Sequence, residues 1–506
     1  MTTPLALMPF PIARISPFLL GVFLCCRALS APSTVEQWET LTLSFPGPES
    51  TETGTSNPFT DVSLWVEFKH EQETYQIPGF FAADGQSAES GAKGGNVWQV
   101  RFTPDRPGPW IWSAQMYAGP DAVLLPTDFP HLETHPLPIA NGTFEVTPST
   151  ASDKNFRAYG RLNVDPVSGY FHFPLTNKIW IKGGADSPEN LLAYRDFDGT
   201  YRHSDEFREG ESRPNSSLHA YTPHIPDWNP GDPTWHQGNG KGLIGALNYL
   251  ASTGMNAVYF LTLNIDGDGK DVWPYLTHTD RDRFDCSRLD QWEIVFQHMQ
   301  HLGIALHIVT QETENERLLD GGFTGRERRL YYRELIARFG HHLALIWNLG
   351  EENGPADFSP HGQTSAQQKS MADYLASTDP YGHPVVLHTH STIAGKDEVL
   401  TPLLGHSSLD GLSVQMDNPL CVHSEILHWR QLSHDSGKPW VITMDEIGPW
   451  HTGAGPDADD PTHDELRHRV LWGALMAGAS GVEWYFGAHF AHNDLSAEDW
   501  RSRDTL

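Results

Sequence analysis

Two pairs of adjacent acidic residues stand where short apolar runs of the sequence end. Glu351 and Glu352 follow the run at residues 343–349, and Asp445 and Glu446 follow a second run that begins at residue 440. Apolar runs of this length, closed by Gly and Pro, indicate buried strands. Parallel barrel strands all open on one face, where such proteins keep their chemistry. Hydrolysis of an acetal needs one carboxylic acid and one carboxylate, so the pairs predict a two-carboxylate active site.

The alternative is that these acidic residues cap helices and have no catalytic role. Acidic residues after a strand commonly occupy the first turn of the next helix, and either pair alone favours that interpretation. Two such pairs, each with Trp and Gly nearby, favour catalysis. Retention of configuration further requires the two catalytic carboxyl groups to lie about 5 to 5.5 Å apart, and a neighbouring negative charge raises the pKa of the acid.

Length and charge limit the class of protein. A chain of 506 residues with 39% hydrophobic residues predicts two domains with large cores. The formal net charge of -30 argues against nucleic acid or an anionic membrane surface as the main partner.

The first 31 residues have the pattern of a signal peptide. Arg14 precedes an apolar run at residues 15–26, and small residues follow at 28–31. We therefore expect a secreted or periplasmic protein with no membrane insertion after removal of the leader. Cys286 and Cys421 would then be the remaining cysteines, which allows one disulfide and excludes a disulfide scaffold.

Residues 32–148 are predicted to form an all-β sandwich. Short β-branched and aromatic runs alternate there with Gly, Pro, Asn and Asp clusters. Trp98, Trp110 and Trp112 are either core residues, the favoured interpretation, or a platform for stacking on sugars. The runs lie at residues 38–45, 62–70, 97–103, 110–116 and 142–147.

Residues 158–506 are predicted to form an α/β domain, a (β/α)8 TIM barrel, because eight apolar runs alternate with helical patterns. The loop at residues 186–241 is long and rich in His and Trp, so we expect it to shape a cleft at the active end. After the eighth run the last helix is cut short, near Glu498 and Asp499. The eight runs lie at residues 178–183, 256–263, 304–310, 343–349, 384–388, 409–415, 440–443 and 481–485.

Three motifs resemble clan A-type retaining glycoside hydrolases: WNLGEEN at residues 347–353, DEIG at 445–448 and VEWYFG at 482–487. Nearly the whole chain after the leader is similar to secreted bacterial barrels preceded by a sandwich module of unknown function. The resemblance implies that Glu352 is the acid/base and Glu446 the nucleophile. Glu351 stands where the clan has Asn, so the choice between the adjacent glutamates stays open. The residues expected to bind a carbohydrate substrate are Asn348, Glu351, His388, His390, Asp445 and Trp484.

Other chemistries have weaker support. Asn264, Asp266 and Asp268 begin like a calcium loop, but Tyr275 occupies the position of its last ligand, so no metal cofactor is predicted. The histidines lack metal-ligand spacing, and no nucleophile-elbow motif is present. The open alternatives are an inverting hydrolase and a non-catalytic carbohydrate-binding or adhesion protein.

Overall fold

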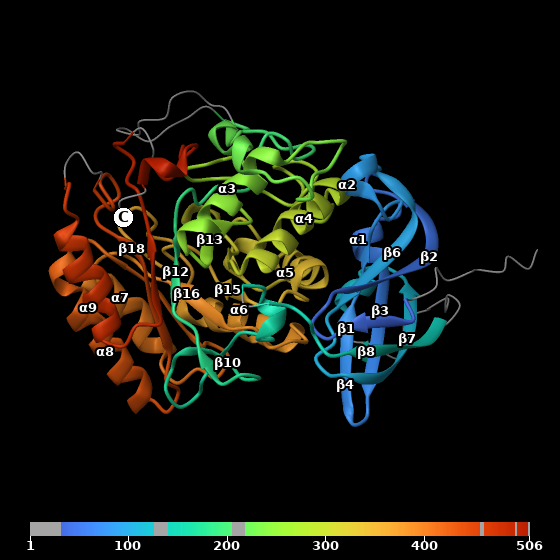
Figure 1. The fold of residues 1–506 in the computed structure, drawn as a ribbon, viewed down its shortest axis with the longest axis horizontal. Coiled ribbons are helices and arrows are strands. Elements are labelled where there is room, and N and C mark those ends of the chain that lie inside the picture. Colours follow the sequence, from blue (N-terminus) through green and yellow to red (C-terminus); the bar gives the residue numbers. More distant parts are fainter. Residues whose placement is uncertain are drawn as a thin grey trace, which may run out of the picture.

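A computed structural model describes residues 32–506 except 126–139, 153, 205–217, 456–459, 491–492 and 504–506. The predicted signal peptide therefore lies outside the described residues. An N-terminal β domain packs beside a larger α/β domain (Figure 1). No helix in the described ranges has the length and apolar character needed to cross a membrane.

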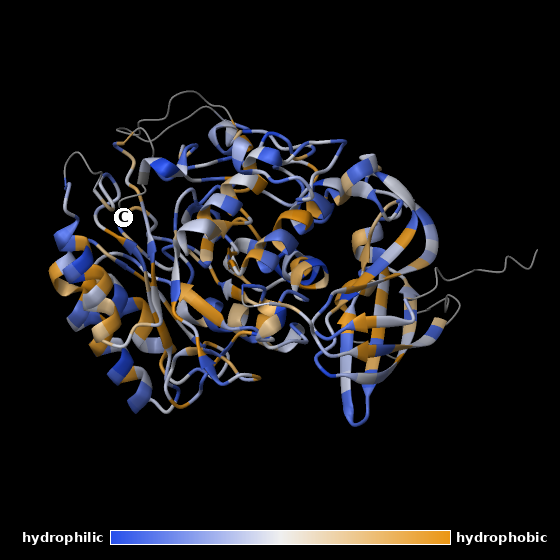
Figure 2. Ribbon diagram, viewed as in Figure 1, coloured by the Kyte–Doolittle hydropathy of each residue, from blue (hydrophilic) through white to orange (hydrophobic). Residues whose placement is uncertain are grey.

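The N-terminal domain contains two sheets, one of five strands in the order β1-β8-β7-β3-β4 and one of three in the order β2-β6-β5. Hydrophobic and hydrophilic residues alternate along these strands (Figure 2). In β7, for example, Trp110 and Trp112 are buried and Ile111 between them is exposed. Trp98 on β6 is also buried, so all three tryptophans belong to the core. The strands are β1 (Thr34–Glu36), β2 (Leu41–Thr51), β3 (Val62–His70), β4 (Glu73–Pro78), β5 (Phe80–Phe81), β6 (Gly94–Phe102), β7 (Gly108–Ala118) and β8 (Ala140–Thr147), with the short helices α1 (Pro58–Asp61) and α2 (Ser87–Ser90).

The larger domain is a closed barrel of eight parallel strands, β12 to β19, in chain order. This confirms the predicted fold class. The first strand was misplaced: Lys178–Ile179 is β11 of a small antiparallel sheet with β10 (Phe171–Phe173) and β9 (Asn163–Val164). The barrel strands are β12 (Lys182–Ala185), β13 (Ala257–Leu261), β14 (Ala305–Val309), β15 (Leu345–Asn348), β16 (Val385–His388), β17 (Gly411–Met416), β18 (Val441–Ile447) and β19 (Gly481–Trp484).

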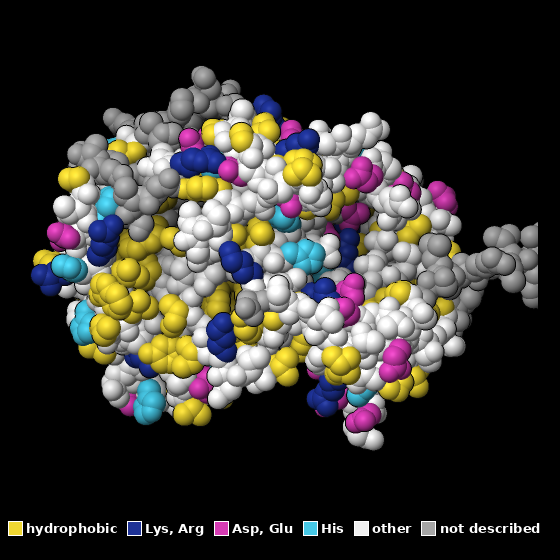
Figure 3. Space-filling view, viewed as in Figure 1, with side chains coloured by type: hydrophobic (Ala, Val, Ile, Leu, Met, Phe, Trp, Pro, Cys, Tyr) yellow, Lys and Arg dark blue, Asp and Glu magenta, His cyan; other side chains and the backbone are white. Residues whose placement is uncertain are grey.

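Helices follow the first seven barrel strands. After β19 the described part of the chain has only the 3-10 helix η9 (Trp500–Arg503). Hydrophobic side chains gather on the side of the barrel that carries β12 and α9 (Figure 3), and Trp472 and Met476 of α9 are exposed. The helices are α3 (Lys241–Thr253), α4 (Cys286–Leu302), α5 (Arg326–Phe339), α6 (Ser365–Thr378), α7 (Ile393–Leu400), α8 (Val422–Asp435) and α9 (Trp472–Met476).

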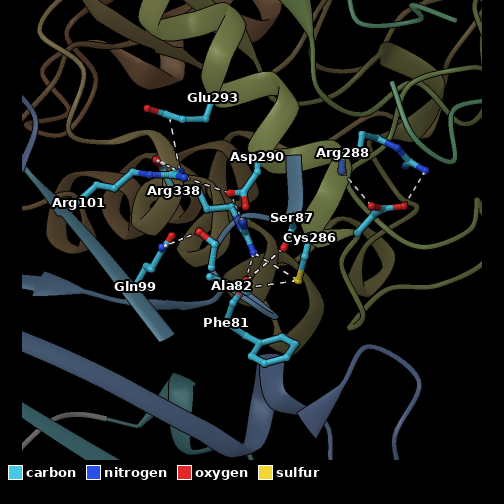
Figure 4. Close-up of polar contacts among 12 residues, drawn as sticks. Phe81, Ala82, Ser87, Gln99, Arg101, Cys286, Arg288, Asp290, Glu293 and Arg338 are labelled. Atoms are coloured by element: carbon cyan, nitrogen blue, oxygen red, sulfur yellow. Dashed lines mark hydrogen bonds and ion pairs between the residues drawn. The ribbon is translucent and has the colours of Figure 1, made fainter. Parts of the chain in front are cut away.

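Buried charges join the two domains (Figure 4). Asp290 on α4 lies 3.0 Å from Arg101 on β6 and 3.3 Å from Arg338 on α5. The Cys286 thiol lies beside them and is free, as is Cys421. The β domain is therefore fixed to the barrel by the ion pairs that Arg101 forms with Asp290 and Glu293, which are shielded from solvent.

Candidate active site

A β-bulge in β18 brings two adjacent carboxylates into the barrel. Val414 pairs with Met444 and Gln415 pairs with Glu446, so Asp445 is an extra residue on β18. A bulge re-aims the side chains next to it, which a regular strand would send to opposite faces. Asp445 and Glu446 are both buried in the barrel and point to different partners.

Glu446 lies against the ends of β16 and β17. Its Oε1 accepts a hydrogen bond of 2.6 Å from Gln415, and its Oε2 lies 3.2 Å from Nε2 of His388. Burial raises the pKa of Glu446 to about 8, although the Gln415 bond lowers it, and the charge of Asp417 raises it further. The side chain is 4% exposed. Gln415 thus favours the carboxylate form in a site that otherwise favours the acid.

Asp445 faces the opposite side of the barrel interior. Its Oδ1 lies 2.8 Å from Nζ of Lys182 on β12, and its Oδ2 accepts a bond of 2.6 Å from Thr443. Asp445 is fully buried. Its predicted contact with substrate stays a prediction, and its observed partners are protein groups.

Glu351 and Glu352 follow β15 and differ in their surroundings. Burial raises the pKa of Glu351 well above its ordinary range; a hydrogen bond with Glu312 lowers it, and the charges of Glu446 and Glu352 raise it. The Glu351 carboxylate is thus electrostatically coupled to Glu446. Both residues are half-buried, and Glu352 has a backbone φ of 38°. That left-handed conformation is uncommon for a residue with a side chain and concentrates at functional sites.

Further carboxylates, which sequence reasoning missed, surround this pair. Glu189 and Glu312 each offer an oxygen within 4.8 Å of one on Glu351. Burial and the charges of neighbouring carboxylates raise the pKa of Glu189, Glu312, Asp186 and Asp494 well above ordinary values. Such a cluster of carboxyl groups retains protons at neutral pH or binds a positively charged group. One signal was available for Asp186, because it directly follows the first barrel strand as Glu351 follows the fourth.

Asn348 and the two histidines line the same end of the barrel. Asn348 is fully buried; its Nδ2 lies 3.1 Å from His307, and its Oδ1 accepts a bond from the backbone of His388. Burial lowers the pKa of His388 and of His390 to about 4, so both are neutral at pH 7. Nδ1 of His390 is buried and has no hydrogen-bond partner among the described residues. Contacts of these side chains with substrate remain predictions.

Trp484 does not lie with the carboxylates. Its neighbour Glu483 points into the barrel, so Trp484 points outward. There it lines a cavity of about 250 Å³ with Tyr249, Leu250 and Trp500. The aromatic side chains that do face the acidic group are Tyr259 and Tyr485, whose pKa values are raised by burial and then by these carboxylates.

The long loop after β12 contributes acids to the site. Asp186 and Glu189 come from its start, whereas the described His and Trp side chains pack against protein. His219 lies 2.7 Å from Glu498 and 2.9 Å from Asn190, and Trp235 is fully buried. Residues 205–217 of this loop lie outside the described residues.

In the loop at residues 264–271, Asn264 caps the backbone. Its Oδ1 accepts from the amide of Lys270. Within the described ranges, the closest groupings with ligand geometry are Glu189–Glu312–Glu351, His307–Asp445–Glu483 and Glu293–His341–His342. The second of these surrounds the ammonium of Lys182, which already supplies the positive charge.

Comparison with known proteins agrees with this architecture. Residues 34–117 match a domain family of unknown function, DUF5060. No curated protein matches the chain. A provisionally assigned glycoside hydrolase from Bacteroides vulgatus ATCC 8482 superposes with a TM-score of 0.59 at 16% identity, over 92% of this chain and 75% of its own. The predicted resemblance to glycoside hydrolase barrels preceded by a sandwich module is confirmed at the level of the fold.

Two further solved structures superpose less well on this chain. A glycoside hydrolase family 5 protein from Bacteroides vulgatus ATCC 8482 has a TM-score of 0.40 at 14% identity, covering 64% of this chain and 62% of its own. A glycoside hydrolase family 5 mannosidase from Rhizomucor miehei has a TM-score of 0.42 at 9% identity, covering 65% of this chain and 86% of its own.

Proposed function

We propose that this protein is a glycoside hydrolase that cleaves poly- or oligosaccharides with retention of configuration. The observation that carries the proposal is the position of two glutamates, the half-buried Glu351 and the buried Glu446, at the C-terminal ends of β15 and β18, where the charge of Glu446 raises the pKa of Glu351. Barrel enzymes place their chemistry at this end. A retaining glycosidase needs a carboxylic acid and a carboxylate there.

In the first step, the Glu446 carboxylate attacks the anomeric carbon. The bond from that carbon to the leaving oxygen breaks, and this oxygen takes the proton of the acid/base glutamate. In the second step the same glutamate, now a carboxylate, removes a proton from water. The resulting hydroxide attacks the anomeric carbon and releases Glu446, so each group returns to its starting form.

We assign the acid/base role to Glu351, in place of Glu352. The acid must keep its proton near neutral pH beside a negatively charged nucleophile. Burial and the charge of Glu446 raise the pKa of Glu351 in that direction. The resemblance favours Glu352, and its substitution discriminates between the two.

We further propose that the protein acts outside the cytoplasm, on the strength of the leader-like pattern at residues 1–31. An exported hydrolase meets polymeric carbohydrate there directly. The β domain, which is fixed to the barrel by buried ion pairs, would travel with it as part of one rigid enzyme.

The test is release of reducing sugar from a panel of plant and algal polysaccharides, with Glu446→Gln as the matched inactive variant. We expect release by the parent and a loss of at least a thousandfold in Glu446→Gln. The anomer first formed, followed by NMR, should keep the configuration of the substrate. Binding of a polysaccharide without any release would support a carbohydrate-binding protein instead, and an inverted first product would support an inverting hydrolase.

A further inference from the structure

A buried lysine ties together three strands of the barrel beneath the proposed site. Lys182, the first residue of β12, is 2% exposed. Its Nζ lies 2.8 Å from Oδ1 of Asp445 on β18 and 2.9 Å from Oε2 of Glu483 on β19. Burial acts against its charge, but the two carboxylates more than offset burial and raise the pKa of Lys182. Lys182 therefore stays an ammonium ion inside the barrel.

One of these two ion pairs reaches the bulge next to Glu446. Asp445 is the extra residue of β18, and its carboxylate points to β12, whereas the carboxylate of Glu446 points to β16 and β17. A bulge leaves its extra residue out of the strand ladder. The side chain of Asp445 contacts Lys182 and Thr443. These contacts must then keep the backbone of the bulge in its conformation.

We propose that Lys182 is a positioning residue for the nucleophile: its ion pair with Asp445 holds the bulge of β18 in the conformation that directs Glu446 to Gln415 and His388. This inference rests on the proposed function of Glu446. The carboxylates that pair with Lys182 are those of Asp445 and Glu483, and not that of Glu446. The effect of Lys182 on the reaction passes through Asp445 and the backbone between residues 445 and 446.

The structure offers a matched control in Glu483. It lies in contact with the same Lys182, at nearly the same distance and equally buried, but on β19, which carries no residue of the catalytic pair. Glu483→Gln removes one charge and leaves the Lys182–Asp445 pair in place. Asp445→Asn removes the other charge with the same small change in volume and leaves the Lys182–Glu483 pair in place.

We expect Lys182→Met and Asp445→Asn to lower kcat about 10- to 100-fold, because a displacement of a reacting group by about 1 Å has this effect. KM should change less than about twofold, since the observed partners of both side chains are protein groups. Glu483→Gln should keep kcat within about threefold of the parent. Thermal unfolding of each variant shows how much stability the same substitutions remove.

A double-mutant cycle tests the route of the effect. If Lys182 acts through Asp445, adding Lys182→Met to Asp445→Asn should lower kcat no further. The proposal is overturned if Glu483→Gln loses as much kcat as Asp445→Asn, if the two losses multiply in the double variant, or if Asp445→Asn acts on KM instead of kcat. If Lys182→Met does not fold, the kcat values of Asp445→Asn and Glu483→Gln still test the proposal. Failure of the proposed function looks different, because Glu446→Gln would then match the parent on every substrate that responds.

Discussion

Gln415 donates a hydrogen bond of 2.6 Å to Glu446 from the neighbouring strand of the barrel. Both side chains are nearly free of solvent contact. A hydrogen bond from a neutral amide stabilises the carboxylate form and not the acid form. Burial, by contrast, pushes the pKa of Glu446 up to about 8. Gln415 is therefore the described neighbour best placed to keep the nucleophile ionised.

Gln415→Met should lower activity by weakening that ionisation. The substitution keeps the length of the side chain and removes the donor, so the pKa of Glu446 should rise above about 8. A hydrogen bond to a charged group is worth about 1.5 to 3 kcal/mol, so kcat/KM at pH 7 should fall about 10- to 100-fold. The acidic limb of the pH profile of kcat/KM should move to higher pH. Gln431→Met, on the exposed face of α8, is the control and should leave the profile where it is.

The adjacent glutamates can be separated by azide rescue on a substrate with a good leaving group. Such a substrate needs little acid assistance, so Glu351→Ala should still form the glycosyl-enzyme and then stall. Azide needs no general base and should restore turnover, giving a glycosyl azide of retained configuration. With Glu446→Ala, azide should occupy the space of the missing carboxylate and give the inverted azide.

Glu352→Ala is the matched comparison for this experiment. With Glu351 as the acid/base, Glu352→Ala should keep most of its activity and gain nothing from azide. Retained-azide product from Glu352→Ala, with none from Glu351→Ala, would return the role to the residue that the resemblance favours. The products of each variant are identified by NMR, and the steady-state rates are measured in parallel.

Asp290 should contribute more to stability than any exposed ion pair. Asp290→Asn would leave Arg101 and Arg338 without their shared carboxylate at the domain interface, where both are buried. Breaking a buried pair from one side costs about 3 to 5 kcal/mol. Glu73→Gln, which breaks the half-exposed pair with Arg106, should cost less than about 1 kcal/mol. Urea unfolding of the two variants measures both, and equal losses would show that the interface charges do not stabilise the assembly.

The sequence predicted the strands of the barrel well because most of them contain a short run of apolar residues. The first strand is the exception. Its residues Gly183 and Gly184 do not form an apolar run, and a Cβ on Gly184 would lie 2.5 Å from the carbonyl oxygen of Ala257. Close approach of β12 to β13 thus requires glycine at that position, and glycine is not a strand signal. The prediction took the nearby apolar residues of β11 instead.

For the site, sequence reasoning found the acids at the ends of β15 and β18 and missed Asp186 after β12, Glu312 after β14 and the acids that loops deliver. Glu351 and Glu446 stand at strand ends, whose direction the barrel fixes. Glu312 stands three residues after β14, as Glu351 does after β15. Asp494 reaches the same end from the segment after β19, and no local pattern specifies where a loop returns. The bulge at Asp445 was also invisible, because acidic residues after an apolar run indicate the end of a strand, whereas β18 continues to Ile447.

Glu52 should make the stability of the protein depend on pH. It is 1% exposed at the domain interface, where its Oε1 accepts a bond of 2.9 Å from the amide of Cys286. Burial raises its pKa from 4.5 to about 7, and the charge of Asp285 contributes. The folded protein therefore holds this proton more tightly than the unfolded chain. The corresponding stability is fully present below pH 4.5 and is lost as the pH rises through 7.

Glu52→Gln should remove this dependence, because the amide keeps the hydrogen-bond acceptor for Cys286 and does not titrate. Each unit of pKa difference corresponds to about 1.4 kcal/mol, so the parent should lose roughly 2 to 3 kcal/mol relative to the variant between pH 4.5 and pH 7. Urea unfolding at a series of pH values measures the difference. Glu49→Gln, on the exposed side of β2, should follow the parent curve, since solvent surrounds that side chain in both states. Parallel curves for the parent and Glu52→Gln would show that this carboxyl group is ionised to the same extent in the folded and unfolded chains.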